Sequence, residues 1–496
     1  MDQNEAPLLD ALEGYKSSGH YGFTPPGHRS GRGADERTLA TIGRDAFRSD
    51  VLLNGGLDDR KSSKGLLQRA QDLMAEAVSA DQAFFSTGGS SLSVKAAMLA
   101  VAGGKGQLLV ARDAHKSVVA GIVFAGLMPR WVQPRWDPER HIAHPPSPHA
   151  VEEAFARFPR AAGCLIVSPT PYGTCADIAG IAEVCHRLGK PLIVDEAWGA
   201  HLPFHEDLPE WAMSCGADVC VVSVHKMGAG FEQGSVFHVQ GDLVDRTRLA
   251  KCADLLGTTS PNVLVLAAID GWRRNMVQEG HAVLERALDL SKHVRREIDA
   301  LPGFRVLGEE LVAAEASHDL DRLQILADVS ELGISGYDGG DWLREHERVD
   351  LGLFDHSHIL ASLSLADDAT TAQRLLHSLA RLGRSAGELP RPKPISFPEP
   401  EDLELEPVMP PREAFFADVE LVDARKAVGR IAAEQLTPYP PGIPVVVPGE
   451  TLNEPVVEYL RSGVAAGMVV PDATDRTLGK IRVVGPTRGP WADQRS

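Results

Sequence analysis

Two polar clusters in this sequence directly follow apolar runs, and each contains a charged residue that is costly to bury. The run 219–222 leads into His225 and Lys226, and the run 191–194 leads into Asp195. Continuous apolar runs rich in β-branched residues are typical of strands buried in a parallel sheet. Because open α/β sheets bind their ligands beyond the carboxyl ends of the strands, we expect Lys226 and Asp195 to share one binding site.

An amine and a carboxylate at one sheet edge are groups that can bind pyridoxal phosphate (PLP). Lys226 would form a Schiff base with the cofactor aldehyde, and Asp195 would pair with the pyridinium nitrogen. A lone lysine after a strand is explained equally well as a solvated surface residue, because its ammonium group is strongly hydrated. The PLP hypothesis therefore depends on what other strand ends supply.

Two further strand ends supply suitable groups. Residues 83–91 combine an apolar stretch, a Gly-Gly turn and two serines that open a helix predicted over 92–101. Free N–H groups and hydroxyls at a helix start can bind phosphate, although an ordinary helix cap has the same composition. His115 follows the apolar run 108–111, and its imidazole could stack on a cofactor ring or simply cap a helix. Both interpretations of each motif stay open at this point.

The spacing of the elements predicts an α/β fold with a mostly parallel sheet. Apolar residues recur with helical periodicity over 65–80 and 178–188, and a further buried strand is predicted at 165–167. Strands that alternate with helices at this spacing are typical of βαβ units. Residues 302–382 alternate shorter predicted strands and helices, which indicates a second, smaller α/β domain.

The composition changes after residue 386. Residues 387–411 are rich in proline and glutamate, which indicates an extended linker. We predict a helix over 412–435. A rigid extended strand is predicted over 439–450, where prolines are interspersed with apolar residues.

Composition and charge disfavour several functions. The 496 residues are 43% hydrophobic and carry a net charge of −18, which disfavours broad nucleic-acid binding. The start of the chain lacks the pattern of a signal peptide, and no apolar run approaches the roughly 20 residues of a membrane span. The six cysteines form no Cys-x-x-Cys pair, so we expect a reduced, cytoplasmic compartment.

Competing ligand motifs are missing from the sequence. The segment 228–234 is not Gly-x-Gly-x-x-Gly, and no Gly-Lys-Ser/Thr phosphate loop occurs. The pairs His141/His144 and His201/His205 stand among prolines without a glutamate partner on a helix, so we expect no metal site.

In their order and spacing, the motifs together resemble the Orn/Lys/Arg decarboxylases of the aspartate-aminotransferase-like (fold type I) PLP enzymes. The resemblance extends over nearly the whole chain and suits the short form, which lacks the N-terminal wing domain of the large enzymes. The motifs that carry it are Pro26-Gly-His28, Ser86-Thr-Gly-Gly-Ser-Ser91, His115-Lys-Ser117, Asp195-Glu-Ala-Trp-Gly-Ala-His201, Ser223-Val-His-Lys226, Thr258-Thr-Ser-Pro261, Pro411-Arg-Glu-Ala414 and Thr437-Pro-Tyr-Pro-Pro-Gly-Ile-Pro444 with Pro448-Gly-Glu450.

This resemblance implies a domain order and an assembly. The expected segments are an N-terminal arm (1–30), a PLP-binding large domain (31–300), a small α/β domain (301–386), the Pro-rich linker (387–411) and a C-terminal α+β decarboxylase domain (412–496). The resemblance also implies a homodimer as the minimal unit, in which residues 258–260 complete the phosphate site of the neighbouring subunit.

Carried over by position, the resemblance implies roles for individual residues. Lys226 is the expected Schiff-base lysine and Asp195 the partner of the ring nitrogen. His115 is the expected ring-stacking histidine, and either His225 or Lys226 would donate a proton. The residues expected to bind the cofactor are Gly88, Gly89, Ser90, His115, Asp195, Ala197, His201, Ser223, His225, Lys226, Thr258, Thr259 and Ser260.

The expected reaction is the decarboxylation of arginine, lysine or ornithine to an amine and CO2, within polyamine biosynthesis. Glu232 and Glu450 are candidates to bind the distal cation of the substrate. Glu232 and Asn262 also depart from the family pattern. Transamination, oxidation or retro-aldol cleavage of a cationic amino acid are therefore alternatives, as is a catalytically silent regulatory homologue.

Overall fold

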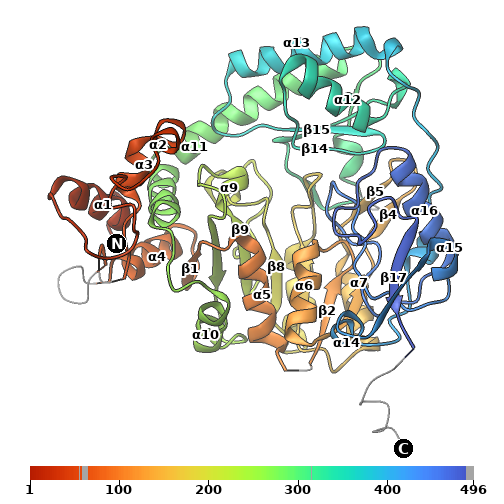
Figure 1. Cartoon of the computed structure of the whole chain (residues 1–496), viewed down its shortest axis with the longest axis horizontal. Helices are drawn as coiled ribbons and strands as arrows, with labels where there is room; N and C mark the ends of the chain where they lie inside the picture. The colour runs from red at the N-terminus through yellow and green to blue at the C-terminus, as the bar shows by residue number, and fades with distance from the viewer. Residues whose placement is uncertain (55, 59–64, 105, 314–315, 487–496) are drawn as a thin grey trace, which may run out of the picture. The chain divides into compact units, whose positions relative to one another are not determined.

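The computed structural model describes residues 1–54, 56–58, 65–104, 106–313 and 316–486 (Figure 1). The chain forms two compact units, and each unit is built from two stretches of sequence. Unit 1 comprises Met1–Ala100 and Ile178–Glu285, and unit 2 comprises Val101–Asp177 and the described residues from Arg286 onward. The domain boundaries predicted from the sequence stay predictions, and residues 487–496 of the predicted C-terminal domain lie outside the described residues.

Four strands of unit 1 lie side by side in the order β1, β10, β9, β8. β8 (Leu192–Asp195) and β9 (Val219–Ser223) run parallel, and every residue of both strands is buried. β10 (Ser235–Val239) is antiparallel to β9, and β1 (Gln82–Ser86) is antiparallel to β10. The apolar runs of β8 and β9 therefore match strands that are covered on both faces.

Helices connect these strands. Those that lie wholly or mostly in unit 1 are α1 (Pro7–Ser17), α2 (Glu36–Ile42), α3 (Arg44–Ser49), α4 (Leu66–Ala77), α5 (Gly89–Ala102), α8 (Ile178–Arg187), α9 (Val224–Met227), α10 (Arg246–Leu256) and α11 (Val263–Asp299). α4 and α8 confirm the helices predicted over 65–80 and 178–188. The helix predicted over 92–101 begins earlier, at Gly89, which places both serines of the motif in its first turn.

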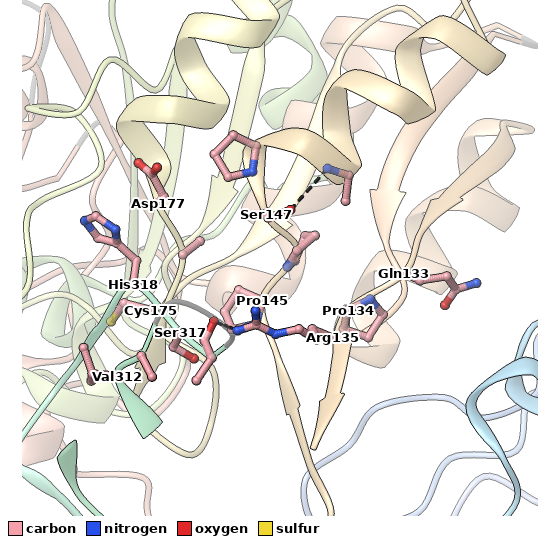
Figure 2. A pocket seen from close by; sticks show the side chains of 16 residues that line it. Gln133, Pro134, Arg135, Pro145, Ser147, Cys175, Asp177, Val312, Ser317 and His318 are labelled. Atoms are coloured by element: carbon pink, nitrogen blue, oxygen red, sulfur yellow. Dashed lines mark hydrogen bonds between the residues drawn. The ribbon is translucent and has the colours of Figure 1, made fainter. Parts of the chain in front are cut away.

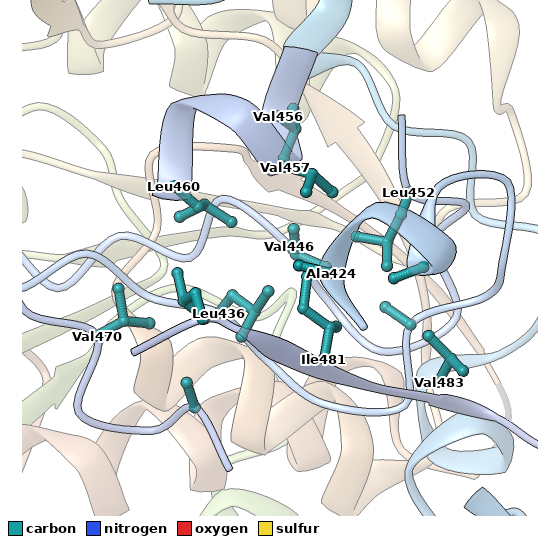
Figure 3. Close-up of a cluster of buried hydrophobic side chains, with 14 of the residues drawn as sticks. Ala424, Leu436, Val446, Leu452, Val456, Val457, Leu460, Val470, Ile481 and Val483 are labelled. Atoms are coloured by element: carbon teal, nitrogen blue, oxygen red, sulfur yellow. The ribbon is translucent and has the colours of Figure 1, made fainter. Parts of the chain in front are cut away.

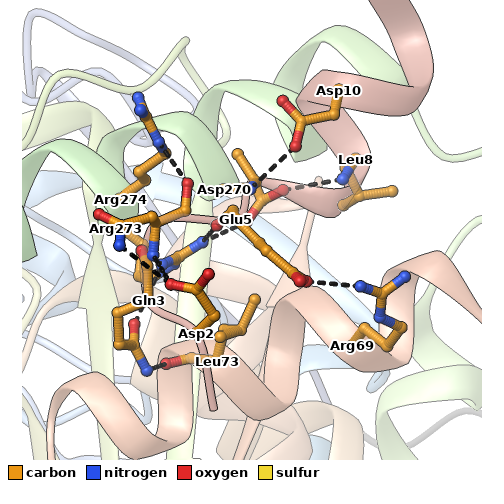
Figure 4. Close-up of polar contacts among 12 residues, drawn as sticks. Asp2, Gln3, Glu5, Leu8, Asp10, Arg69, Leu73, Asp270, Arg273 and Arg274 are labelled. Carbon is orange, nitrogen blue, oxygen red and sulfur yellow. Dashed lines mark hydrogen bonds and ion pairs between the residues drawn. The ribbon is translucent and has the colours of Figure 1, made fainter. Parts of the chain in front are cut away.

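The N-terminal segment is held on α11 by a buried ion pair (Figure 4). Arg273 and Asp270 are both fully buried, and Nη2 of Arg273 lies 3.1 Å from Oδ1 of Asp270. The Arg273 guanidinium donates to the backbone carbonyls of Gln3 and Glu5, and Asp270 accepts the backbone N–H of Leu8 at 2.8 Å. The first residues of the predicted arm are therefore fixed to the body of unit 1.

Unit 2 contains three parallel strands in the order β6 (Cys164–Val167), β2 (Gln107–Ala111) and β3 (Met128–Val132). Together with the parallel pair β8–β9, they confirm the prediction of a mostly parallel sheet in an α/β fold. Further elements of this stretch are α6 (Lys116–Ala125), β4 (Arg135–Asp137), β5 (Ile142–His144), α7 (Pro148–Arg157) and β7 (Thr174–Cys175).

A second, antiparallel sheet in unit 2 matches the alternation predicted over 302–382. Its strand order is β11 (Arg305–Val306), β13 (Gln324–Asp328), β15 (His358–Ser362) and β14 (Leu353–Phe354). The helices α12 (Gly336–Trp342) and α13 (Ala369–Ser385) belong to the same stretch, and β12 (Asp319–Leu320) pairs with β7 instead. Within the described ranges, we find no helix with the length and apolar character needed to cross a lipid bilayer.

The C-terminal part, which we define as residues 398–486, supplies all but one of the buried residues of a hydrophobic core, to which Tyr337 also belongs (Figure 3). Leu436, Val446, Leu460 and Ile481 are fully buried in this core. The elements around it are α14 (Pro411–Phe415), β16 (Val419–Asp423), α15 (Ala424–Ala427), α16 (Glu454–Ala465) and β17 (Lys480–Val484).

Two predictions for the C-terminal part are wrong. The helix expected over 412–435 is replaced by two short helical segments and by β16, because Val419–Asp423 pairs antiparallel with Lys480–Val484 and this pairing outweighs local helix propensity. The rigid strand expected over 439–450 is a looped segment. Gly442 and Gly449 have φ values of 90° and 95°, so the backbone turns where a strand would continue.

Candidate active site

The site predicted around Lys226 lies within unit 1. Asp195 is the last residue of β8, and Lys226 lies in α9, the single helical turn that follows β9. Since β8 and β9 are adjacent and parallel, their carboxyl ends bring Asp195 and Lys226 to the same edge of the unit. This is the arrangement that the two apolar runs predicted.

Asp195 carries a buried oxygen that is not satisfied by the chain. The residue is 3% exposed, and its Oδ1 has no hydrogen-bond partner among the described residues. Burial raises the pKa of Asp195 to about 6, and the charge of Lys226 and the backbone N–H of Ala197 oppose that shift. A buried polar atom without a partner costs about 1–3 kcal/mol. Oδ1 is therefore suited to accept a hydrogen bond from a bound ligand, as the ring nitrogen of PLP would require.

Lys226 is mostly buried, and its amine faces an aromatic ring. Burial lowers the pKa of Lys226, and the carboxylate of Asp195 opposes this shift. Nζ lies 4.3 Å from the centroid of the Trp198 ring, which is a cation–π contact. An amine with a lowered pKa is more often neutral and therefore nucleophilic toward an aldehyde. The sequence analysis included Trp198 in a motif but gave it no role.

A set of donors lies where α5 begins. Ser223 Oγ, at the end of β9, donates to Ser90 Oγ in the first turn of α5 at 2.8 Å. Gly89 is buried at the helix start, whereas Gly88 before it is exposed. The Gly89 N–H donates to the carbonyl of Gln233 at 2.9 Å, so the groups suited to bind a phosphate are the following N–H groups of the first helical turn together with the two hydroxyls. The residues present thus fit both ends of PLP, the ring nitrogen and the phosphate.

The remaining predicted residues of unit 1 lie in four places. Nδ1 of His225 is 2.9 Å from the carbonyl oxygen of Gly234, and because a carbonyl only accepts, Nδ1 carries the proton. Ala197 and His201 are buried in the segment that follows β8. Residues 258–260 are exposed in the loop between α10 and α11, and Glu232 is exposed in the segment after α9.

His115 lies in unit 2, at the N-terminus of α6. Its Nδ1 accepts the backbone N–H of Ser117 at 3.2 Å and lies 2.9 Å from the hydroxyl of the same residue. The ring therefore caps the helix, which was one of the two roles open from the sequence. Capping engages one edge of the ring and does not conflict with stacking, which uses a face.

Glu450, also in unit 2, is 1% exposed and lies in a buried ion pair. Its Oε2 is 3.2 Å from Nη2 of Arg112 and accepts the backbone N–H of Val447 at 2.7 Å. Its Oε1 accepts the indole N–H of Trp131 at 3.1 Å. Because both oxygens are engaged within the chain, these contacts favour a structural role for Glu450 over the predicted contact with substrate.

Two buried acids escaped the sequence analysis. Asp113 is 3% exposed, neither oxygen has a hydrogen-bond partner among the described residues, and burial raises its pKa to about 7. Glu196 is fully buried, and burial raises its pKa well above the usual range, while its Oε2 accepts the thiol of Cys220 at 3.1 Å. Both acids follow buried strands almost directly, and this position is the signal that could have identified them.

His205 lies among acids but is already engaged by them. His205 could share a metal ion with Glu206 and His281, or with Asp207 and Glu285, within the described part of the chain. However, its Nδ1 accepts the backbone N–H of Asp207 at 3.1 Å, and its Nε2 lies 2.9 Å from Glu285. Both ring nitrogens are accounted for, so we assign no metal here.

A cavity of about 730 Å³ lies in unit 2, away from the predicted residues (Figure 2). Polar side chains from several segments line it, among them Gln133, Arg135, Ser147, Asp177 and His318. None of the predicted site residues is part of its lining. The cavity therefore contributes nothing to the assignment of the site.

The fold and this residue set define the class of the protein: it is a fold type I PLP enzyme. A solved structure of serine palmitoyltransferase from Sphingomonas wittichii shares the fold, with a TM-score of 0.53 at 15% identity over 73% of this chain and 86% of that chain. The expected fold is thereby confirmed.

Within that class, the chain belongs to the Orn/Lys/Arg decarboxylase family. The model of the family's major domain matches residues 6–371, and that of its C-terminal domain matches residues 398–477. Arginine decarboxylase from Bacillus subtilis is 35% identical over 98% of this chain and 99% of its own length. The structure of constitutive lysine decarboxylase from Escherichia coli has a TM-score of 0.79 at 19% identity, over 98% of this chain and 82% of that chain.

These findings confirm the family and its short form, PLP as cofactor, and the reaction class, decarboxylation of a basic amino acid. They leave open which amino acid is the substrate and which residue does what.

Proposed function

We propose that this protein is an arginine decarboxylase that converts L-arginine to agmatine and CO2. Two similarities support arginine over lysine. The chain is 35% identical to an arginine decarboxylase of matching length, but only 23% identical to the constitutive lysine decarboxylase of Escherichia coli. The observation that carries the assignment of the site is the unsatisfied oxygen of Asp195 beside the buried amine of Lys226.

In this proposal the chain binds PLP through four kinds of contact. Lys226 holds the cofactor covalently, and the carboxylate of Asp195 pairs with the ring N–H. The imidazole of His115 stacks on the ring. The phosphate is bound by Gly88, Gly89, Ser90, Ser223 and His225, and by Thr258, Thr259 and Ser260 of the neighbouring subunit. Ala197 lies against the ring, and His201 is a further residue of the cofactor site.

When bound, PLP supplies an electron sink for the pair of electrons released as the bond between Cα and the carboxylate breaks. Asp195 keeps the ring nitrogen protonated, which strengthens this sink, because a buried negative charge stabilises the adjacent cation. The side chains around the substrate would orient that bond for cleavage, and this orientation would select decarboxylation over loss of the Cα proton.

A proton must then replace the departed CO2 at Cα. Lys226 would supply this proton from its ammonium form, which the ring face of Trp198 would stabilise, and the transfer would leave a neutral amine. His225 is the second candidate, with Nε2 as the donor, because Nδ1 is engaged by Gly234.

The distal guanidinium of arginine requires a carboxylate. Glu232 is the candidate in the proposal, since it is exposed in the segment that follows Lys226 and its side chain is available for a bidentate contact. Glu450 drops out of this role because Arg112, Trp131 and Val447 engage both of its oxygens.

We also propose a cytoplasmic homodimer that acts in polyamine biosynthesis. The exposed loop 258–260 lies next to Leu255, which is 73% exposed, and Phe231 is 58% exposed on the segment after α9. Apolar side chains exposed beside candidate phosphate ligands are consistent with a surface that a second subunit covers.

A product assay tests the proposal. PLP-loaded protein is incubated in parallel with arginine, lysine and ornithine, and the products are identified by mass spectrometry. Agmatine formed faster than cadaverine or putrescine supports the assignment. A keto acid or an oxidised product would leave the fold and cofactor in place and overturn the substrate and reaction proposed for this chain.

A further inference from the structure

Two consecutive backbone carbonyls of unit 1, those of Gln233 and Gly234, connect the turn that carries the lysine to the start of α5. The Gln233 carbonyl accepts the N–H of Gly89 at 2.9 Å. The Gly234 carbonyl accepts the backbone N–H of Val224 and the Nδ1–H of His225, both at 2.9 Å. Contacts within unit 1 therefore hold the His225 imidazole close to the first turn of α5, where the hydroxyls and N–H groups suited to a phosphate lie.

The hydrogen bond to Gly234 determines which ring nitrogen of a neutral His225 carries the proton. A carbonyl only accepts, so Nδ1 is protonated, and a neutral imidazole has a single N–H. Nε2 of the neutral ring is therefore an acceptor. Among the described residues Nε2 has no hydrogen-bond partner, and the side chain is only partly buried, so this nitrogen is accessible to a ligand.

A phosphate does not suit the neutral form of this ring. At pH 8 a phosphate monoester is mostly a dianion, and its unprotonated oxygens only accept hydrogen bonds. A phosphate oxygen and the lone pair of Nε2 would repel each other. The imidazolium form donates from both nitrogens, so Nε2–H can bind the phosphate while Nδ1–H keeps its bond to Gly234.

We propose that His225 binds the cofactor phosphate only as the imidazolium, and that phosphate binding therefore takes up one proton from the solvent at Nε2. This inference rests on the proposed function, in which His225 contacts the phosphate. The imidazolium adds a positive charge to a set of donors that is otherwise neutral, namely the hydroxyls of Ser90 and Ser223 and the N–H groups of α5. Since Nε2 is then engaged by the phosphate, Lys226 remains the donor of the proton to Cα.

The elements around this imidazole carry few titratable side chains. Lys226 is the next residue of α9, and its amine is influenced by the charge of Asp195. Glu232 is exposed in the segment after α9, the first charged residue of α5 is Lys95, and β10 carries the buried His238. None of these forms an ion pair with the imidazole within the described part of unit 1. The bound phosphate is thus the anion that stabilises the added proton.

The test uses 4-deoxypyridoxine 5′-phosphate, which keeps the ring and the phosphate but has no aldehyde with which Lys226 could react. Cofactor-free protein is titrated calorimetrically at pH 8 in buffers of different ionisation enthalpy, and the dependence of the heat on the buffer gives the number of protons taken up. His225→Gln is compared with the wild type, because an amide donates a hydrogen bond without taking up a proton. His281→Gln is the matched control, since it removes an exposed imidazole of unit 1 that pairs with Glu206 instead.

We expect the wild type and His281→Gln to take up about one proton more than His225→Gln when the compound binds. Between pH 7 and 9, the affinity of the wild type should accordingly fall more steeply than that of His225→Gln, by about tenfold per pH unit. Equal proton numbers in the wild type and His225→Gln would overturn the inference and leave the cofactor site in place. A compound that binds without competing with PLP would overturn the proposed cofactor site together with the inference.

A second measurement covers the case in which His225→Gln does not fold or does not bind the compound. Inorganic phosphate is titrated into the cofactor-free wild type, and phosphorus NMR gives the charge of the bound phosphate from its chemical shift. A bound dianion together with the uptake of about one proton supports the inference, because the proton is then on the protein. A bound monoanion, or a dianion bound without proton uptake, would contradict it.

Discussion

Two buried acid–base pairs of this protein are arranged in opposite ways. In unit 2, Glu450 and Arg112 lie 3.2 Å apart, and both carboxylate oxygens and the guanidinium have further partners. In unit 1, Asp195 and Lys226 influence each other's pKa, yet Oδ1 of Asp195 has no partner within the described chain. The first pair is complete without a ligand, and the second is not.

The difference distinguishes groups that support a site from groups that do chemistry. A buried charge is tolerated in a structural role when its hydrogen bonds are satisfied, as they are for Asp270 and Arg273 under the N-terminal segment. A buried carboxylate that lacks a partner destabilises the fold, and it is explained when a ligand supplies the missing contact. Whether the hydrogen bonds of a buried charged group are satisfied therefore indicates its role better than its burial or its charge alone.

The largest effect is expected for Lys226→Ala. Loss of the covalent contact and of the proton donor should lower turnover at least about a thousandfold. The cofactor-free variant should be as stable as the wild type, because removing a desolvated amine relieves its burial. Decarboxylation assays and denaturant unfolding measure the two effects. Cofactor absorbance that persists through dialysis in this variant would contradict the role of Lys226.

The opposite result is expected for Glu450→Ala. Removing one partner of a complete buried pair leaves Arg112 uncompensated and should lower the free energy of unfolding by about 3–5 kcal/mol. Glu420 pairs with Arg430 at 2.9 Å on the surface of the same part of the chain, so Glu420→Ala is the matched control and should cost about 0–1 kcal/mol. Equal losses of unfolding free energy in both variants would show that the buried ion pair is no more important for stability than the surface pair.

Asp195→Asn should act mainly on chemistry. We expect turnover to fall by roughly a hundredfold or more, because the negative charge that stabilises the ring nitrogen is lost while the shape is kept. Stability of the cofactor-free protein at pH 8 should not fall, since the wild-type carboxylate is ionised there without a full set of partners. Parallel kinetic and unfolding measurements distinguish this pattern from a structural role, which would lower both quantities.

The most specific effect is expected for Asp113→Asn as a function of pH. The pKa of Asp113 is about 7 in the folded protein and 3.8 as an ordinary aspartate, so the wild type progressively loses stability as pH rises from about 4 to 7. The asparagine variant has no such loss. It should be more stable than the wild type by up to about 4 kcal/mol above pH 7, and the difference should vanish near pH 4.

Asp137 provides a control of opposite sign for this experiment. Burial alone would raise the pKa of Asp137, but hydrogen bonds from Arg140 outweigh burial and lower it. Asp137→Asn should therefore destabilise the protein at neutral pH, with the deficit shrinking as the pH falls toward the pKa of the folded protein. The same trend of stability with pH in both variants would show that burial does not control the pKa of Asp113.

The sequence predicted those features that local patterns determine. The buried strands β8 and β9 were recognisable because parallel strands covered on both faces are continuously apolar, and the positions of Asp195 and Lys226 follow from the strand ends. The helices α4 and α8 were recognisable because one face of each is apolar at helical spacing.

The features that were missed depend on residues far apart in the sequence. The pairing of β16 with β17 joins segments separated by almost 60 residues and overrides the helix that local propensity favoured. Glu450 was one of two candidates for the substrate contact, and its ion pair could not be foreseen because the partner, Arg112, lies 338 residues away. Its engagement with Arg112 and Trp131 could be recognised only in three dimensions.

The same separation affects the order in which the protein can be completed during synthesis. Arg112 leaves the ribosome 332 residues before Pro444, to whose carbonyl its guanidinium donates. Until those residues emerge, a cation destined for burial stays in water, and the segment from Arg112 to His115 lacks its support. The buried contacts of Arg112 are therefore completed only when nearly the last tenth of the chain has emerged. A premature stop codon shortly before residue 442 should yield a less stable protein, in which the Arg112 guanidinium lacks the carbonyl of Pro444 and the carboxylate of Glu450.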